Sequence, residues 1–368
     1  MLGLPSPQTL GDAAANAFDR SFRGGVAEME PSPSTIIEQA PKRTLRRYHP
    51  RPEGTSQTTP VLLVPPLAVP SQCFDLRRGC SLVEHLVDLG YPTYLVEYGA
   101  ISYRDRGLGL EHWIENVLPE AAIAVTTDAG TDSVHLVGWS LGGQMSLLAT
   151  ADGTIPAASV TAIGSPMDIS KVTLMMPLRQ LSQLTGGIVG TGIYRVLGGA
   201  PAPIVKAAFQ LSALDKHLTK PFVVALNLHD RDFLAQIEAV EHFTDNMVAY
   251  PGRTMGQLYH QFFRHNELSD GRLELGDRTI NLADITAPVM AVAGDGDTLA
   301  PQDSVFHVAD RLPNVSEVRL EVAPGGRLGI LTSRSAEETT WRWMDEFMLA
   351  HDPESTTAAD RANSAAAQ

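Results

Sequence analysis

Cysteine is scarce in this chain. Its 368 residues include only Cys73 and Cys80, which are too few for a disulfide framework and lack the spacing of metal ligands. Only Arg77 and Arg78 stand near them in the sequence as groups that would stabilise a thiolate. We therefore expect two reduced packing residues, no metal site and no cofactor.

Basic clusters and long apolar runs are scarce as well. The chain has 28 lysine and arginine residues against 42 aspartate and glutamate residues, so its formal net charge is −14 and binding to nucleic acid has no electrostatic support. No run reaches the roughly 18 uninterrupted apolar residues of a membrane span. The N-terminal Met1-Leu2-Gly3-Leu4-Pro5 soon turns polar and lacks the regions of a signal peptide. These features predict a cytoplasmic protein without a transmembrane segment.

Strand and helix patterns alternate along most of the chain. Six short runs rich in β-branched residues are typical of strands buried mostly on both faces: 61–64, 93–96, 134–137, 160–163, 289–293 and 318–322. Amphipathic helices lie between them, and two have capping boxes, Ser81 with Glu84 and Ser335 with Glu338. The alternation predicts an α/β fold with a mostly parallel, doubly wound sheet, and such sheets carry their sites at the carboxyl ends of the strands.

The composition divides the chain into four parts. Residues 1–40 form an N-terminal arm with one helix, from Thr9 to Phe22, and a Pro/Ser-rich linker. Residues 41–168 and 283–350 form the sheet domain, and 169–282 form a helical cap inserted into it. The Ala, Ser, Thr, Asp and Glu of residues 351–368 bury too little apolar surface to become ordered, so we expect a disordered tail.

The predicted cap begins with a dense apolar stretch. Its members are Leu174, Met175, Met176, Leu178, Leu181 and Leu184. Such a surface adapts to irregular apolar ligands, so one interpretation is an acyl-chain tunnel or lid. The other is ordinary packing within the cap. The cap is also where we would expect a homodimer contact or a protein partner.

The strongest single motif is Gly138-Trp139-Ser140-Leu141-Gly142. An apolar strand pattern ends here and a helical one follows, which is the context of a Gly-x-Ser-x-Gly nucleophile elbow. Glycines remove the Cβ atoms that would collide in so tight a turn. Ser140 is therefore a candidate nucleophile, and the alternative is a glycine-rich turn that contains a serine.

The nucleophile needs an acid and an oxyanion hole. Asp297 follows the predicted strand 289–293 in a Gly/Asp-rich turn, and we predict it to be the orienting acid, with Asp295 in reserve; a plain surface turn is the alternative. After the strand 61–64 two prolines lack an N–H, so Leu67 offers the first backbone donor. The N–H of Leu141 would be the second oxyanion donor.

Several weaker motifs share an order and spacing along the chain. They are Val64-Pro65-Pro66-Leu67, Phe74-Asp75-Leu76, Ser81-Leu82-Val83, Asp105-Arg106, the elbow with its double glycine, Asn227-Leu228-His229-Asp230, Tyr250-Pro251-Gly252, Leu273-Glu274-Leu275-Gly276, Ala287-Pro288-Val289 and Pro324-Gly325-Gly326. Together they resemble the polyhydroxyalkanoate synthase branch of the α/β-hydrolase superfamily, nearest its class III type, over roughly residues 44–350. The resemblance implies an α/β-hydrolase core, a helical cap and covalent acyl chemistry at the elbow.

Two departures from that family pattern decide the chemistry. The synthases resemble one another in carrying cysteine at the elbow, where this chain has Ser140, which suits oxygen esters better than thioester exchange. Where the family pattern Gly-Gly-His-x-Gly supplies the base, this chain has Arg327. Guanidinium stays protonated and has no lone pair to accept a proton, so we expect Arg327 to form a bidentate ion pair with Asp297.

A substitute base would have to be another histidine. His229, His260 and His265 lie in the predicted cap, and each is either such a base or an ordinary surface or packing residue; His135, on a central strand, is expected in the core. Two functions follow. One is a serine hydrolase or acyltransferase acting on an acyl ester or thioester, weakened by the loss of histidine. The other is a non-catalytic protein of the same fold that binds an acyl ligand or a protein partner.

Overall fold

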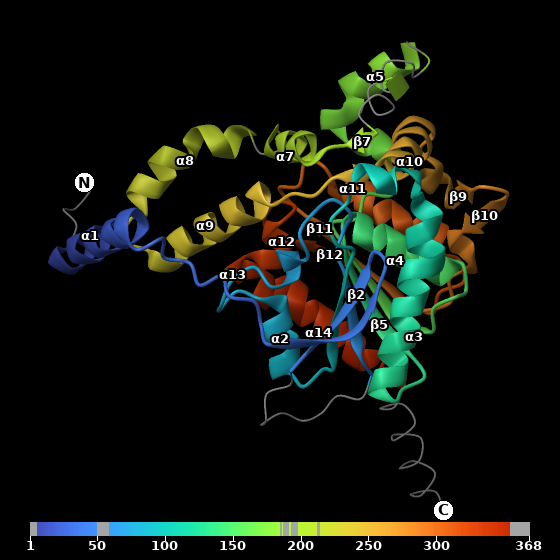
Figure 1. The fold of residues 1–368 in the computed structure, drawn as a ribbon, viewed down its shortest axis with the longest axis horizontal. Helices are drawn as coiled ribbons and strands as arrows, with labels where there is room; N and C mark the ends of the chain where they lie inside the picture. The colour runs from blue at the N-terminus through green and yellow to red at the C-terminus, as the bar shows by residue number, and fades with distance from the viewer. Residues whose placement is uncertain are drawn as a thin grey trace, which may run out of the picture.

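An eight-stranded sheet forms the centre of the molecule (Figure 1). The computed structural model describes residues 6–49, 59–184, 186, 191–192, 198–211 and 214–353. In sheet order the strands are β1 (Ser34–Ala40), β2 (Arg43–Tyr48), β4 (Thr93–Glu97), β3 (Val61–Val64), β5 (Val134–Trp139), β6 (Ala157–Ile163), β11 (Val289–Gly294) and β12 (Val318–Ala323). The six strands from β4 to β12 are parallel, and β2 pairs antiparallel with both β4 and β1. The predicted mostly parallel, doubly wound sheet is confirmed.

Helices cover both faces of this sheet. On one face lie α3 (Leu118–Ala129) and α4 (Leu141–Ala151); on the other lie α2 (Leu82–Asp88), α12 (Gly329–Thr332), α13 (Arg334–Ala336) and α14 (Arg342–Ala350). Alternation along β3 divides its side chains between the two cores: Leu62 and Val64 face α3 and α4, whereas Val61 and Leu63 face α2 and α14. Burial on both faces explains the continuous apolar strand patterns.

The edges of the sheet differ from the sequence prediction. The edge strand β12 has exposed Leu320 and Val322 side chains, so it is not buried on both faces. The other edge, β1 with β2, was not predicted as strand at all, and it places residues 34–40 of the predicted arm in the sheet. Helix α13 begins at Arg334 after Ser333, so the predicted capping box at Ser335 is wrong. At Ser81 the hydroxyl does cap α2, accepting from the Glu84 N–H at 3.1 Å.

Residues 169–282 contain most of the remaining elements. They are α5 (Met176–Leu184), β7 (Gly199–Ala200), α7 (Ala202–Leu211), α8 (Leu214–Leu226), α9 (Arg231–Asp245), β8 (Tyr250–Pro251), α10 (Gly252–Gln257), β9 (Arg272–Leu275) and β10 (Arg278–Asn281), while the short α11 (Gln302–Val305) follows β11. Leu273 and Ile280 of the β9–β10 hairpin pack into the core on the face of the sheet that α3 and α4 cover. Phe243 of α9 packs into the core on the other face, which α2 and α14 cover. This segment is therefore joined to both hydrophobic cores.

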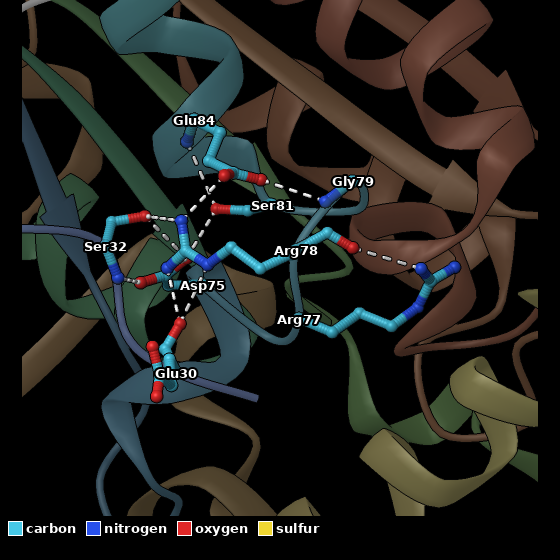
Figure 2. Close-up of polar contacts among 8 residues, drawn as sticks. All are labelled: Glu30, Ser32, Asp75, Arg77, Arg78, Gly79, Ser81 and Glu84. Atoms are coloured by element: carbon cyan, nitrogen blue, oxygen red, sulfur yellow. Dashed lines mark hydrogen bonds and ion pairs between the residues drawn. The ribbon is translucent and has the colours of Figure 1, made fainter. Parts of the chain in front are cut away.

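The N-terminal residues are attached through α9. Helix α1 (Pro7–Phe22) lies beside α9 in Figure 1, and Asp19 forms a 2.7 Å ion pair with Arg231. The Glu238 carboxylate of α9 accepts the Val26 N–H at 2.6 Å. Beyond this contact, the chain leads to the buried Asp75 network shown in Figure 2.

Asp75 is the centre of that network. Its carboxylate accepts the Ser32 N–H at 2.6 Å, the Ser32 hydroxyl at 3.0 Å and the Ser81 hydroxyl at 2.6 Å. Arg78 lies across the same site, donating to the Glu30 carbonyl at 2.8 Å and to Glu84 at 2.6 Å (Figure 2). One buried carboxylate thus joins the N-terminal segment to the start of α2.

Both cysteines and His135 lie where the sequence places them, in the core. Cys73 and Cys80 are free and buried, and burial raises the pKa of the Cys80 thiol to about 11. His135 is fully buried and its Nδ1 shares a 2.8 Å hydrogen bond with the Ser159 hydroxyl. The predicted disordered tail lies, from residue 354 onward, outside the described residues.

We expect Asp75→Ala to lower the free energy of unfolding by about 3 kcal/mol, because it leaves three buried donors without an acceptor. Urea denaturation measures the change, and limited proteolysis should release the segment before residue 32. Asp12→Ala, at an exposed position of α1, is the charge-matched control. Equal effects of the two substitutions would contradict the role of Asp75.

His135 should make the fold sensitive to acid. Burial lowers its pKa to about 4, below the usual value of about 6.5 in the unfolded chain. Above pH 6.5 the imidazole is neutral in both states and the contribution is fully present. As pH falls from 6.5 to 4 only the unfolded state takes up the proton, so stability falls by up to about 1.4 kcal/mol per pH unit.

The matched variants are His135→Gln and, at an exposed position, His229→Gln. Urea denaturation at pH 7, 6 and 5 should show a shallower loss of stability for His135→Gln than for wild type and His229→Gln. Parallel pH profiles for all three proteins would show that His135 does not cause the loss.

Candidate active site

Ser140 occupies a strained turn between a strand and a helix. It follows β5, precedes α4, and has backbone angles of φ 57° and ψ −123°, a conformation that residues other than glycine rarely adopt. Its N–H donates to the Ile163 carbonyl at 2.7 Å, and its own carbonyl accepts the Ser165 hydroxyl at 2.8 Å. The end of β6 therefore holds Ser140 at the carboxyl edge of the sheet.

The glycines around Ser140 are required by close backbone contacts. A Cβ at Gly138 would lie 2.5 Å from the Gly143 Cα, and one at Gly142 would collide with the carbonyl oxygen of Val64. The start of α4 is thus packed directly against the end of β3. Side chains at these positions would push the helix away from the sheet, which explains why the local sequence is Gly-rich.

The loops after β11 and β12 bring two charged side chains to Ser140. Asp297 is buried, and its Oδ1 accepts the N–H groups of Leu299 and Ala300, each at 2.9 Å. Asp295 instead accepts the Gly325 N–H at 2.8 Å and so fixes the loop that carries Arg327. Of the two predicted acids, the structure places Asp297 beside residue 327 and gives Asp295 a loop contact.

Arg327 contacts both members of the predicted site. Its Nη2 donates a hydrogen bond to the Ser140 Oγ, and its Nη1 lies 3.7 Å from the Asp297 Oδ2. The expected bidentate ion pair is therefore wrong: one nitrogen forms a long ion pair and the other turns to the serine. The Arg327 carbonyl accepts the Trp139 indole N–H at 3.0 Å, which anchors this residue to the strand of the elbow.

The electrostatics around Arg327 involve a residue that sequence reasoning did not single out for the site. Burial lowers the pKa of the Arg327 guanidinium, and the Asp297 charge opposes this. Burial also raises the pKa of Tyr250 to about 12, against the effect of the Arg327 charge. Tyr250 belongs to β8, which pairs with β7 in residues 169–282, so that segment contributes to the site. The only signal in the sequence was the Tyr250-Pro251-Gly252 motif.

The two predicted oxyanion donors lie on segments that touch. Leu141 is the first residue of α4, where N–H groups have no acceptor within the helix, and Leu67 lies on the loop after β3 against which Gly142 packs. Leu67 also lines a pocket of about 210 Å³, whose wall includes Val69, Trp113 and Pro251. The pocket begins beside the elbow, although the side chains of Ser140 and Arg327 are not part of its lining.

The histidines of the predicted cap are engaged elsewhere or exposed. His260 shares a 3.2 Å hydrogen bond with the Thr191 hydroxyl, and the side chains of His229 and His265 are exposed. Among the described residues no histidine hydrogen-bonds to Ser140; the one side chain that does so is Arg327. The structure thus brings together Ser140, Asp297 and Arg327, and no imidazole from the described ranges hydrogen-bonds to this group.

Three side chains of the apolar stretch at the start of the predicted cap are exposed. Leu184 is 86% exposed, and Leu174 and Met176 are exposed as well. The side chains of Leu178 and Leu181 lie outside the described residues. In the described ranges, no group of three His, Cys, Asp or Glu side chains is placed to hold a metal ion, and every helix is too short or too polar to cross a bilayer.

Comparison with known proteins yields sequence relatives with one shared name. No protein-family profile matches the chain. It is 26% identical over 325 residues to the poly(3-hydroxyalkanoate) polymerase subunit PhaC of Allochromatium vinosum, covering 86% of this chain and 89% of that one. The Synechocystis protein of the same name is 24% identical over 321 residues, covering 86% and 85%. That of Haloferax mediterranei is 22% identical over 341 residues, and the match covers 90% of this chain but 66% of the longer relative.

Solved structures show the same fold. The structure of BpoC of Mycobacterium tuberculosis, a protein assigned as a non-heme bromoperoxidase, superposes on this chain with a TM-score of 0.50 at 14% identity, covering 86% of this chain and 97% of that one. At this identity the likeness concerns the fold alone. The parallel sheet, the strained serine between β5 and α4, and the sequence relatives lead to one conclusion. The chain has an α/β-hydrolase fold and is similar in sequence to the poly(3-hydroxyalkanoate) polymerase subunits named above.

Proposed function

We propose that the chain is a serine-dependent acyl hydrolase or acyltransferase that acts on an acyl ester or thioester, with turnover limited by the lack of an imidazole base. The observation that carries this proposal is the geometry of Ser140, held at φ 57° where the carboxyl edge of the sheet meets the start of α4. The named relatives are polymerase subunits for hydroxyalkanoates, which supports acyl transfer as the reaction class.

Each residue of the site has a role in this proposal. The Ser140 hydroxyl attacks the acyl carbonyl carbon, and the alcohol or thiol leaves as the acyl-serine forms. The backbone N–H groups of Leu67 and Leu141 stabilise the oxyanion. Asp297, with one oxygen fixed by two backbone N–H groups, is oriented to support a base at position 327.

Arg327 is what makes this reaction slow. A guanidinium donates hydrogen bonds and does not accept protons at neutral pH, so it cannot take the Ser140 proton. Its contact with the Ser140 Oγ uses an acceptor lone pair of the nucleophile. Loss of a triad member leaves about 10³ to 10⁴-fold acceleration over water, from the oxyanion hole and binding alone.

The same contact favours a second candidate function. A cation that holds the nucleophile as a hydrogen-bond acceptor is an arrangement for binding rather than for proton transfer. In this alternative the protein keeps the fold and the pocket beside Leu67 but binds an acyl ligand without reacting. The side chain at position 327 separates the two candidates.

Replacement of the cation by an imidazole should restore catalysis. We expect Arg327→His to raise hydrolysis of p-nitrophenyl acetate by on the order of 10² or more, because general base catalysis contributes about 10² to 10⁴-fold. The wild type should label slowly with a serine-directed fluorophosphonate, and Arg327→His should label faster. The double variant Ser140→Ala, Arg327→His should lose both gains.

Arg327→Gln is the matched control, because it removes the charge without supplying a base. A gain of the same size in Arg327→Gln would mean that relief from the cation, not proton transfer, limits the wild type. If neither wild type nor Arg327→His labels or hydrolyses ester while both remain folded by circular dichroism, the enzyme proposal is wrong and the binding function stands.

A further inference from the structure

Arg327 retains unused hydrogen-bonding capacity inside the site. Its Nη1 is buried and has no hydrogen-bond partner among the described residues, and it lies 3.7 Å from Asp297 Oδ2, beyond hydrogen-bonding distance. The side chain as a whole is 18% exposed. Buried donors normally have partners, and a guanidinium that lacks one in a functional cleft is a ready anchor for an acceptor.

Asp297 cannot complete the pairing from its present position. Its Oδ1 is held by the N–H groups of Leu299 and Ala300, and only Oδ2 faces the guanidinium. A bidentate pair needs two oxygens in the plane of the fork. A carboxylate that approaches from the Ser140 side offers both, replacing the single Nη2 contact with the serine hydroxyl.

The surroundings of Arg327 favour an anion. Helix α4, with 11 residues, begins at Leu141, directly after Ser140, and directs its positive end toward this point. The Tyr250 phenol lies close enough to couple with the Arg327 charge. Among the described residues, Asp297 is the carboxylate that pairs with Arg327, through the single 3.7 Å contact of its Oδ2, while two backbone N–H groups hold its Oδ1.

A pocket for an apolar tail starts at the loop after β3 that contains Leu67. The pocket of about 210 Å³ starts at Leu67 of the oxyanion loop and is bounded by Ala249 and Pro251, the two neighbours of Tyr250. Its wall is largely apolar, with Val69 and Trp113 among its members. The volume is below the roughly 300–1,000 Å³ of sites for drug-sized ligands, so it suits a short chain.

We infer that the site binds the free carboxylate form of a short acyl compound, with the carboxylate on Arg327 and the chain in the pocket beside Leu67. This inference rests on the proposed function for the location of the acyl site and names the ligand that this site holds best. Hydrolysis of an acyl ester releases such a carboxylate, so Arg327 would also retain the product.

Isothermal titration with hexanoate and its neutral analogue hexanamide tests the inference on the full chain. Charge-assisted hydrogen bonds contribute more than neutral ones, so hexanoate should bind at least about tenfold more tightly than hexanamide. Arg327→Gln should abolish this preference, and Arg327→Lys, which keeps the charge but lacks the fork, should weaken hexanoate binding. Arg334→Gln, an exposed arginine outside the site, is the matched control and should bind as wild type.

Ser140→Ala separates this inference from the proposed function. It removes the nucleophile and frees Arg327 Nη2, so hexanoate binding should persist while fluorophosphonate labelling is lost. Equal affinity for hexanoate and hexanamide, or an unchanged preference in folded Arg327→Gln, overturns the inference. If hexanoate does not bind but Arg327→His hydrolyses ester, the inference is wrong and the proposed enzyme function stands. Carboxylate binding that depends on Arg327 in a protein without any Ser140 reactivity supports the inference and contradicts the enzyme proposal.

Discussion

The close approach of α4 to the end of β3 determines the rest of the site. Gly142 leaves space for the Val64 carbonyl, and this contact places the start of the helix against the loop that contains Leu67. Since β5 is buried on both faces, the chain has to turn within one residue, and Ser140 takes the positive φ. The loops after β11 and β12 then deliver Asp297 and Arg327 to the same edge of the sheet, as expected for a parallel sheet.

Local features of the sequence were enough to predict this framework. The buried strands appear as short apolar runs because helices cover both faces, and the elbow appears because no Cβ fits at Gly138 or Gly142. The edge strands β1 and β2 escaped prediction because they carry charged side chains, including Arg43 and Arg46, whose ion pairs with Glu120 and Glu97 form only in the folded chain. Edge strands receive their identity from pairing rather than from a hydrophobic pattern.

The contacts of Arg327 show where sequence reasoning reaches its limit. Charge alone predicts a bidentate pair between Arg327 and Asp297. That prediction leaves out the other hydrogen-bond partners of the Asp297 carboxylate. Two backbone N–H groups from Leu299 and Ala300 occupy Oδ1, so the guanidinium meets one oxygen and turns its second nitrogen to Ser140. Tyr250 enters the site through the β7–β8 pairing, a long-range contact that local residue patterns do not encode.

The elbow presents a serine nucleophile, which supports the enzyme proposal, but it does not supply the base that turnover requires. The Ser140 conformation is fixed by the Gly142 contact and by the hydrogen bonds to Ile163 and Ser165, all of which stabilise the fold whether or not a reaction occurs. A strained serine would therefore persist after catalysis was lost, because relaxing it would require α4 to move off the sheet. The chemistry depends instead on position 327. A histidine has a lone pair that accepts the serine proton, whereas the arginine donates to the serine and keeps a second nitrogen without a hydrogen-bond partner in the described part of the chain. This difference is the basis of the anion binding that we propose for the site.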